Sequence, residues 1–582
     1  MRDPTIVRRP LAREAPQFPG LHPVTSRVLA ARGIRSQADL DLGLAGLHPP
    51  GQLGAIEGAA ALIAEVMAMQ GRILVVGDFD ADGATSSALA VRALRQMGAL
   101  EVSYLVPNRS EYGYGLTPEI VTLARTMKPA LIITVDNGVS SIEGVAVARA
   151  AGIRVLVTDH HLPGAVLPQA DVIVNPNLQG DEFPSKALAG VGVIFYVMSA
   201  LRAHLRHSGW FADRSVPEPR LADLLDLVAL GTVADVVPLD QNNRRLVAQG
   251  LARIRAGACQ PGIRALAEVA GRRPEHLVTA DLGFALGPRL NAAGRLADMS
   301  IGIECLLSDD PARCAALAEQ LNTLNRERRD IEQEMRDQAF DLIEATLPDV
   351  SDEALPAAFC VFHDSWHPGV VGIVAARVKD RYHRPVIAFA AADDGSLKGS
   401  ARSVPGLHIR DVLDEVAAQA PELLSRFGGH AMAAGLSLER QHFDAFAARF
   451  EKTVDARLDE ASRHKQLLSD GELSAACFDL ALAQELAAVA PWGQAFPEPR
   501  FDGVFRIIDR RIVGGSHARL RLSPADSAET IAAIAFSGAD SDWYREADTI
   551  RALYKLGVNH YRGVETVQLV VDHAVPLSGA AQ

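Results

Sequence analysis

The chain has 582 residues, of which 48% are hydrophobic and 22% charged, and its formal net charge is −13. This composition is too apolar for a disordered protein, and no apolar run reaches the ~18 residues that a transmembrane helix needs. Since proteins that coat duplex DNA are usually basic, the acidic balance leaves two readings: a nucleic-acid role that depends on local basic patches, or excess acid that sits in a metal site.

Five cysteines are present, an odd number with no CxxC pair. This argues against a disulfide scaffold and a cysteine zinc site, and it fits a reducing cytoplasm. The N-terminal sequence MRDPTIVRRPLAREAP has no apolar segment of the secretory type. We therefore expect a cytoplasmic protein that does not enter the membrane.

Residues 1–54 are rich in Pro and Gly and are predicted to form an N-terminal arm with a short helix or two. From residue 55, apolar runs alternate with helical stretches, and strands are predicted at 72–77, 101–106, 131–135 and 154–158. That alternation predicts βαβ units with a mostly parallel sheet. Such sheets bind ligands at the carboxyl ends of their strands, where the strand order reverses.

Helical stretches dominate from about 190 to 345, and neither Gly nor Pro occurs between Pro311 and Pro348. Apolar residues recur there at helical spacing, which predicts one helix of about 30 residues, or ~45 Å, as a strut between two lobes.

A second α/β unit is predicted from about 355 to 455, and it ends in a Gly/His turn at 428–430. The segment ASRHKQLL is expected to be helical. Five short strands are then predicted between 501 and 574, a pattern that suits a small β-barrel, with an OB-fold as one option.

Three aspartates alternate in GDFDADG, directly after the first predicted strand. If the chain stays extended, Asp78, Asp80 and Asp82 point to one side. Carboxylates gathered in this way repel one another unless cations bind, so the motif indicates a metal site, with a solvated acidic loop as the alternative. An EF-hand does not fit, because the twelfth position of its loop needs Glu and is Leu89 here.

Polar residues also follow two later predicted strands. Asp136 comes after 131–135, although an aspartate that caps the next helix would look the same. Asp159, His160 and His161 come after 154–158. Adjacent side chains diverge in an extended chain, so one histidine is expected to bind metal and the other to face the substrate. Asp235, in LGTVADVVPL, is by itself an unremarkable buried aspartate.

Together these residues form an oxygen-rich set with some imidazole. Such ligands suit Mn²⁺ or Mg²⁺ better than Zn²⁺ or copper. They are too many for one metal, and two ions sharing a bridging carboxylate favour in-line hydrolysis of a phosphate ester.

The motifs resemble those of a known family. Asp159-His160-His161 after a strand, with GDFDADG upstream, is similar to the DHH phosphoesterase superfamily. The segments LVPNRSEYGYG, LGPRLNAAGRL, SWHPGVVGIVAARV, KGSARS and RFGGHAMAAG, in this order, resemble the RecJ-type single-strand-specific exonucleases. The resemblance covers residues 70–440 and is weaker in the tail.

The resemblance implies an α/β fold, in which a parallel-sheet DHH lobe is joined by a long helix to a second α/β, DHH-associated lobe and a C-terminal OB-like barrel. The expected domains are an N-terminal arm, the catalytic domain, a helical connector, the DHH-associated domain and the barrel, at 1–54, 55–240, 241–350, 351–460 and 461–582.

The resemblance also implies roles for single residues. Two divalent ions, Mn²⁺ or Mg²⁺, would be held by Asp78, Asp80, Asp82, Asp136, His160 and Asp235. Asp159 would orient His160, and His161 would face the scissile phosphate, either polarising it or protonating the leaving oxygen.

Further residues are candidate nucleic-acid contacts. In the second lobe the family holds the strand with a Ser/Arg loop and a Gly-Gly-His turn, which correspond here to Ser400 and Arg402 and to Gly428, Gly429 and His430. Nearer the metals, Arg109 and Arg289 are candidate phosphate contacts, and Tyr112 and Tyr114 are candidates to stack on an unpaired base. An ordinary turn, a surface arginine and plain packing are the alternatives.

The tail carries a local basic patch, with six arginines against two aspartates between 500 and 521. Interleaved with Phe501 and Phe505, it suits capture of a strand by an OB-like barrel, although a solvated barrel face would look similar.

The expected function is a single-stranded-DNA-specific 5′-to-3′ exonuclease of DNA repair and recombination, which releases 5′-mononucleotides by two-metal hydrolysis. Its polarity is implied by the resemblance alone. Expected partners are single-strand-binding protein and a RecQ-type helicase, and we expect a monomer. The alternatives are a DHH phosphoesterase acting on short oligonucleotides, cyclic dinucleotides or polyphosphate, and a related non-catalytic replication scaffold, which should have lost metal ligands.

Overall fold

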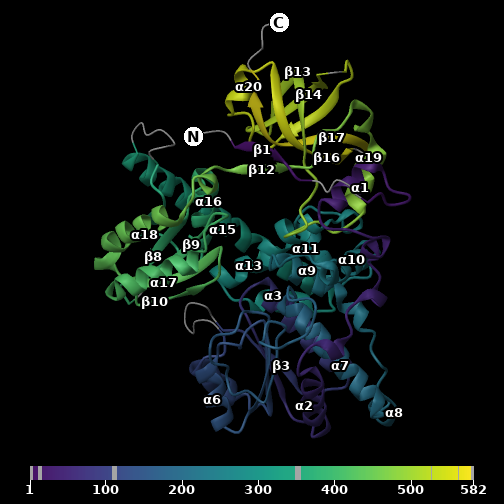
Figure 1. Cartoon of the computed structure of the whole chain (residues 1–582). Coiled ribbons are helices and arrows are strands. Elements are labelled where there is room, and N and C mark those ends of the chain that lie inside the picture. The colour runs from purple at the N-terminus through teal and green to yellow at the C-terminus, as the bar shows by residue number, and fades with distance from the viewer. Residues whose placement is uncertain are drawn as a thin grey trace. The chain divides into compact units, whose positions relative to one another are not determined.

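The computed structural model describes residues 4–10, 16–107, 115–347, 355–392, 394–525, 527–561 and 563–577 (Figure 1). The chain forms two compact units. The N-terminal unit comprises 11–325 and 480–499, and the C-terminal unit comprises 1–10, 326–479 and 500–582.

A parallel five-stranded sheet organises the N-terminal unit. Its order is β3-β2-β4-β5-β6, with β2 at Ile73–Gly77, β3 at Val102–Leu105, β4 at Leu131–Val135, β5 at Arg154–Thr158 and β6 at Val172–Val174. The chain passes from β2 to β3 and then returns across β2 to β4, so the strand order reverses between β2 and β4. Ligands bind at such a switch point.

Helices cover both faces of this sheet. The α3 and α7 helices, Ala81–Gln96 and Gly190–His207, pack on one face beside α2, Ile56–Ala68. On the other face, α5 and α6, Pro118–Thr126 and Ile142–Ala150, join a core that includes Leu74 and Ile132 of the strands. Burial on two faces explains why the strands are continuous apolar runs in the sequence, as predicted.

The rest of the N-terminal unit is helical, and it includes one turn of π-helix, η6, at Leu282–Leu286. Its other helices are α1 (Pro23–Ala30), α8 (Trp210–Asp213), α9 (Leu225–Ala234), α10 (Gln241–Arg255), α11 (Pro261–Val269), α12 (Thr279–Asp281), α13 (Gly287–Leu296), α14 (Ser300–Leu307) and α19 (Leu480–Ala488).

The long helix predicted between the prolines is confirmed as α15, Pro311–Thr346, and its 36 residues exceed the predicted length. The boundary between the two units falls inside this helix, after Asn325.

Among the described residues, no single helix is long and apolar enough to cross a membrane, although the bent pair Leu44–Gln52 and Ile56–Ala68 together meets that criterion.

The C-terminal unit contains a mixed sheet of order β10-β11-β9-β8-β7, in which only β7 and β8 are parallel. Its strands are β7 (Phe359–Phe362), β8 (Val386–Ala391), β9 (Ser396–Arg402), β10 (Arg426–Gly429) and β11 (Ala433–Glu439), and its helices are α16 (Val371–Tyr382), α17 (Ile409–Gln419) and α18 (Phe443–Arg457).

Two local predictions in this sheet need correction. The segment expected to be a Ser/Arg loop lies mostly in strand β9, where Ser400 pairs with Gly435 and Arg402 with Ala433. The expected Gly-Gly-His turn is correct only in part, since Gly428 and Gly429 end strand β10 and His430 begins the turn to β11. Pairing with neighbouring strands extends the glycine-rich segments beyond what their sequence suggested.

Five strands form a barrel in the order β13-β14-β15-β17-β16, and β16 pairs back onto β13. They are β13 (Phe501–Val513), β14 (His517–Pro524), β15 (Ile531–Ala535), β16 (Thr549–Tyr561) and β17 (Val564–Pro576), with α20 at Asp542–Glu546. The ring closes through a short parallel ladder, Ala533–Leu569 and Ile534–Val570. The predicted barrel is therefore confirmed.

The role in strand capture that was predicted for the aromatic residues of the tail patch is wrong. Phe501 and Phe505 are fully buried against Tyr554 inside the barrel, so neither is available to a nucleic-acid strand. Strand β13 alternates its side chains between core and solvent, and the sequence did not reveal which set faced inward.

The helix expected at ASRHKQLL was also wrong. This segment forms a 3₁₀ turn and then strand β12, Gln466–Ser469, which pairs in parallel with β1, Thr5–Arg8. The partner strand lies more than 450 residues earlier in the chain, so a local reading of the sequence had no access to it.

Candidate metal centre at the strand ends

The first aspartate motif bends at the switch point instead of staying extended. Asp78 follows β2, and Asp80 is the N-cap of α3, where its Oδ1 accepts a 3.0 Å hydrogen bond from Gly83 N. Asp82 already lies in the first turn of α3. The extended arrangement predicted for these three carboxylates is therefore wrong, because capping of α3 turns the chain.

Asp82 is buried against the start of α7. Its Oδ2 accepts a hydrogen bond from Gly190 N at 2.6 Å, and its Oδ1 accepts one from Val191 N at 3.0 Å. These bonds and the positive helix end favour a charged carboxylate. Burial and the charges of Asp235 and Asp80 nevertheless raise the pKa of Asp82 well above its usual value.

Asp136 follows β4 in the left-handed backbone region, with φ of 63°. This conformation is uncommon outside glycine, although aspartate tolerates it better than most residues. Burial, followed by the charges of Asp82 and other aspartates, raises the pKa of Asp136 well above the usual range. A buried carboxylate among other carboxylates needs a compensating positive charge.

Asp159 holds His161, and not His160 as predicted. Its Oδ1 lies 2.8 Å from His161 Nδ1 and accepts hydrogen bonds from the His160 and His161 backbone, while its Oδ2 accepts one from Val139 N. Although burial opposes it, hydrogen bonding from His161 lowers the pKa of Asp159. Conversely, burial alone would lower the pKa of His161, but the bond to Asp159 raises it to about 9.

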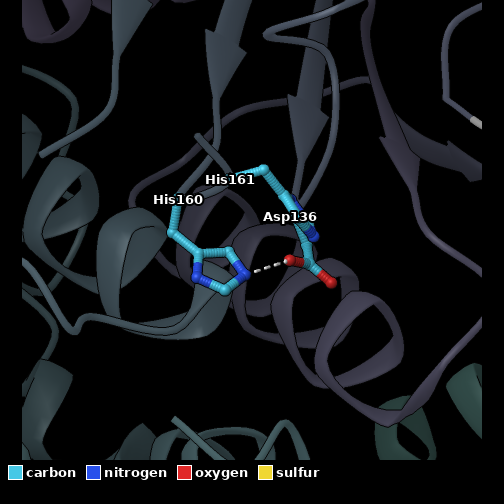
Figure 2. Close-up of side chains that lie close together, drawn as sticks. All are labelled: Asp136, His160 and His161. Carbon is cyan, nitrogen blue, oxygen red and sulfur yellow. Dashed lines mark ion pairs between the residues drawn. The ribbon is translucent and has the colours of Figure 1, made fainter. Parts of the chain in front are cut away.

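The His160 ring lies near two other carboxylates. Its Nε2 lies 3.1 Å from Asp136 Oδ1, as Figure 2 shows, and 3.5 Å from Asp235 Oδ2. Asp235 is the C-cap of α9. Burial, then the charge of Asp80, raises the pKa of Asp235 to about 7.

Two asparagines, missed in the sequence, fix the backbone of the histidine pair. Asn175 Nδ2 donates to the carbonyl of His161 at 2.8 Å, and Asn177 Nδ2 donates to that of His160 at 2.6 Å. Both follow strand β6. The rule that found Asp136, a polar residue after a buried parallel strand, would have found them as well.

Ligand atoms gather here in three sets, and within each set they all lie within 4.8 Å of one another. The first set is Asp78, Asp80 and Asp136, the second is Asp82, His160 and Asp235, and the third is Asp136, His160 and His161. Asp136 and His160 each belong to two sets. The donors are carboxylate oxygens with a minority of imidazole, which is the chemistry that Mn²⁺ and Mg²⁺ accept. Burial and mutual repulsion raise the pKa values of these carboxylates, and divalent cations would offset that repulsion, so the residues fit such ions.

The LGPRLNAAGRL motif packs against the aspartate motif of the metal centre. Asn291 Oδ1 accepts a hydrogen bond from Ala81 N, the first residue of α3. At Gly294, a Cβ atom would lie 1.7 Å from the carbonyl oxygen of Phe79, so only glycine fits. Arg289 is buried, and it donates to Ala285 O at 2.5 Å and Asn322 Oδ1 at 3.1 Å. These bonds within the protein favour a structural role over the predicted phosphate contact.

In the C-terminal unit, the candidate strand-binding residues lie on β9 and β10, except that His430 directly follows β10. Arg402 Nη1 donates to Ser400 Oγ at 3.0 Å. Gly429 has φ of 144°, and a Cβ atom there would lie 2.5 Å from the Ala433 carbonyl, so a side chain is excluded. His430 N donates to the same carbonyl at 2.8 Å. The candidates Arg109, Tyr112 and Tyr114 lie outside the described residues.

The arginines of the barrel differ in how they are engaged. Arg500 pairs with Asp572 and Arg511 with Asp509, while Arg510 donates to the Ala547 carbonyl and lies 3.4 Å from Asp548. Three arginines project from the outer face of β13 and β14, namely Arg506, Arg519 and Arg521. Fewer arginines of the basic patch are therefore available to a nucleic-acid strand than the six in its sequence suggested.

Comparison with protein families finds three matches along the chain. Residues 72–232 match the model of the DHH family, N-terminal domain. Residues 355–456 match the DHHA1 domain, and residues 469–573 match the RecJ OB domain.

Similar proteins cover nearly the whole chain. The single-stranded-DNA-specific exonuclease RecJ of Salmonella typhimurium is 51% identical over 582 residues, which is 99% of this chain and all of that protein. The Escherichia coli protein of the same name is 50% identical over the same length and coverage. The crystal structure of RecJ from Thermus thermophilus in complex with Mn²⁺ is similar with a TM-score of 0.78 at 31% identity, over 96% of this chain and 76% of that one.

Proposed function

The chain belongs to the RecJ family of single-stranded-DNA-specific exonucleases, and from this membership we propose that it degrades single-stranded DNA from the 5′ end and releases 5′-mononucleotides. The observation that carries the proposal is the buried cluster in which His160 Nε2 lies 3.1 Å from Asp136 and 3.5 Å from Asp235. The structures of the Thermus thermophilus relative hold Mn²⁺ or Mg²⁺, and the oxygen-rich cluster here suits the same ions.

Two ions would share the cluster. Asp78 and Asp80 would hold one, His160, Asp235 and Asp82 the other, and Asp136 would join both sets. When bound, such a pair activates water and offsets negative charge on a phosphodiester. The hydrogen bonds to Asp82 from Gly190 and Val191 keep one ligand rigid before any ion arrives.

His161 would act on the substrate beside the ions. Its bond to Asp159 holds it as a cation at neutral pH, with a pKa of about 9. A positively charged imidazole attracts a scissile phosphate and has a proton to give to the leaving oxygen. Asp159 serves as the positioning residue for this ring, and Asn175 and Asn177 position the two backbone carbonyls.

The DNA strand would be held by residues outside the metal cluster. We assign this role to Ser400, Arg402, Gly428, Gly429 and His430, and to Arg109, Tyr112 and Tyr114. Arg289 is the least suited of the original candidates, because its guanidinium is buried in bonds to the protein. The division into an arm, a DHH domain, a connector, a DHH-associated domain and a barrel, as set out from the sequence, is part of the same proposal.

The wider setting of the enzyme rests on family membership. We infer that it acts as a monomer in the cytoplasm, in DNA repair and recombination, with single-strand-binding protein and a RecQ-type helicase as partners. Pull-down of each partner with the full chain, and sedimentation of the protein alone, would test these assignments.

The activity is tested by digestion of one single-stranded oligonucleotide in Mn²⁺, labelled at the 5′ end in one reaction and near the 3′ end in another. We expect prompt release of a labelled mononucleotide from the 5′ label and a descending ladder from the 3′ label. A duplex of the same sequence and the Asp136→Ala protein should both be inert.

Release of a mononucleotide from the 3′ label first would reverse the proposed polarity. No cleavage of DNA at any length would overturn the proposed function, and short oligonucleotides, cyclic dinucleotides and polyphosphate would then be the substrates to test.

A further inference from the structure

Two strongly exposed apolar side chains lie on segments that meet at the C-terminal end of α9, which Asp235 caps. Phe284, in the π-helical turn η6, is 81% exposed, and Val236, the residue after Asp235, is 61% exposed. Apolar side chains near a site built from charged residues are not needed for ion binding. Single exposed apolar side chains are common on protein surfaces, so exposure alone does not mark a binding surface.

The segments that carry these two residues both lie against Val233, in the last turn of α9. The carbonyl oxygen of Val233 accepts a 3.3 Å hydrogen bond from Val236 N. A Cβ atom built on Gly283, the neighbour of Phe284, would lie 3.8 Å from the same oxygen and 3.2 Å from Val233 Cγ1. The turn that carries Phe284 is therefore packed on the last turn of α9, the helix that Asp235 caps.

Both residues sit in unusual backbone. Val236 has φ of 64°, which is strongly disfavoured for a β-branched residue. A single turn of π-helix is rare and is frequently found at functional sites. Strain of this kind persists where the surrounding structure enforces it, and it is concentrated at ligand-binding sites. Two irregular segments, both at the end of α9 that Asp235 caps, thus carry exposed apolar side chains.

We propose that Phe284, supported by Val236, is a stacking platform for one unpaired base of the DNA strand at the metal centre. This inference rests on the proposed function and identifies a specificity residue for it. Every base has an aromatic face, so stacking is tolerant of sequence. A base in a duplex is already stacked and paired, so the platform selects single strands.

The test is steady-state digestion of an oligothymidylate in Mn²⁺ by the full-length protein and three variants. In Phe284→Ala we expect KM to rise roughly fivefold to 100-fold, the range that loss of one stacked base gives, with kcat changed less than about threefold. Phe284→Tyr, which keeps the ring, should restore KM. Val236→Gly, which glycine's tolerance of positive φ allows to fold, should raise KM less than Phe284→Ala does.

Leu100→Ala is the matched control, because Leu100 is 70% exposed and directly precedes β3. It therefore lies at the amino-terminal ends of the parallel strands, whereas the metal cluster lies at their carboxyl ends. The KM of this variant should equal that of the wild type. A second readout uses oligonucleotides with one abasic position moved along the strand. The wild type should show one position at which KM rises, and Phe284→Ala should be insensitive to it.

The inference is overturned if Phe284→Ala behaves like Leu100→Ala, if kcat falls while KM is unchanged, or if both proteins respond alike to the abasic series. A wild type that leaves single-stranded DNA intact would instead overturn the proposed function, and the wild-type reaction alone distinguishes that result.

Discussion

Asp136 and Asp502 are both almost completely buried, at 2% and 1% exposure, yet their neighbours carry opposite charges. Asp136 faces Asp82, Asp80 and Asp235, and burial together with these charges raises its pKa. Asp502 accepts bonds from Arg8, Arg551 and Ser469 at 2.6–3.0 Å, and although burial opposes the shift, these partners lower its pKa to about 2.

The difference separates a site for a ligand from a site for stability. At Asp502 the protein supplies positive charge through Arg8 and Arg551. The ion pair with Arg8 also links strand β1 to strand β13 of the barrel. At Asp136 the protein places several other carboxylates, with His160 Nε2 3.1 Å away, and a bound cation would offset the repulsion among them. Buried carboxylates that repel one another are costly, so we expect the cluster to lower the stability of the metal-free N-terminal unit.

Removing the Asp136 charge gives the largest expected effect. Asp136→Asn should lower the rate of single-stranded DNA digestion at least ~100-fold, because even residues outside the ligand shell of metal sites often contribute 10- to 100-fold. The same change should raise the melting temperature of the metal-free protein, since it relieves repulsion. An active variant, or a less stable metal-free one, would show that Asp136 is an ordinary structural carboxylate.

Removing the Asp502 charge should do the reverse. Asp502→Ala leaves Arg8 and Arg551 without their shared carboxylate, and we expect a loss of about 2–3 kcal/mol in the unfolding free energy of the C-terminal unit. Chemical denaturation followed by circular dichroism measures this loss. Affinity for Mn²⁺ should be unchanged, and a weaker affinity would break the distinction between the two sites.

A smaller effect is expected where an uncharged side chain supports the metal site. Asn177→Ala removes the 2.6 Å bond to the His160 carbonyl, and we expect about a tenfold lower rate of digestion, with folding intact. Asn559→Ala, in the barrel, is the control with a comparable amide removed. Equal rates for the two variants would mean that Asn177 does not position His160.

The pH dependence of stability should also differ between the sites. The folded-state pKa of Asp235 is raised to about 7, so the folded metal-free protein holds a proton that the unfolded chain releases above pH ~4. Its stability should therefore fall as pH rises from ~4 to ~7. Asp502 contributes the opposite slope, because its stabilisation is complete above pH ~4 and is lost as pH falls toward about 2.

Thermal melting at pH 5, 6, 7 and 8 after chelation measures this slope. We expect a melting temperature that is a few degrees lower at pH 8 than at pH 5, and Mn²⁺ should restore it. A flat profile, or one that Mn²⁺ does not change, would argue against a metal-dependent cluster of carboxylates.

Much of the N-terminal unit was predictable, because buried parallel strands leave continuous apolar runs and the residues that follow them meet at one edge. That rule placed Asp78, Asp136 and Asp159 correctly at strand ends. It did not reveal which groups would pair. The start of α3 inside the aspartate motif redirected Asp80 and Asp82, and Asp159 turned to His161 instead of His160.

The C-terminal unit was less predictable because its local structure depends on which strands pair. Strand β12 exists through pairing with β1, which lies more than 450 residues earlier, and the glycine-rich segment at Gly428 is a strand because it forms a hairpin with β11. The direction of Phe501 and Phe505 depended on which face of β13 closed the barrel. None of these choices is encoded in local periodicity.

Titration of the metal-free protein with Mn²⁺ by calorimetry, in wild type, Asp136→Asn and Asp502→Asn, tests most directly whether the two buried carboxylates differ as described. We predict about two ions per chain with release of protons in the wild type, fewer ions in Asp136→Asn, and the wild-type result in Asp502→Asn. Equal Mn²⁺ binding by the wild type and Asp136→Asn, or no binding by the wild type, would contradict the account.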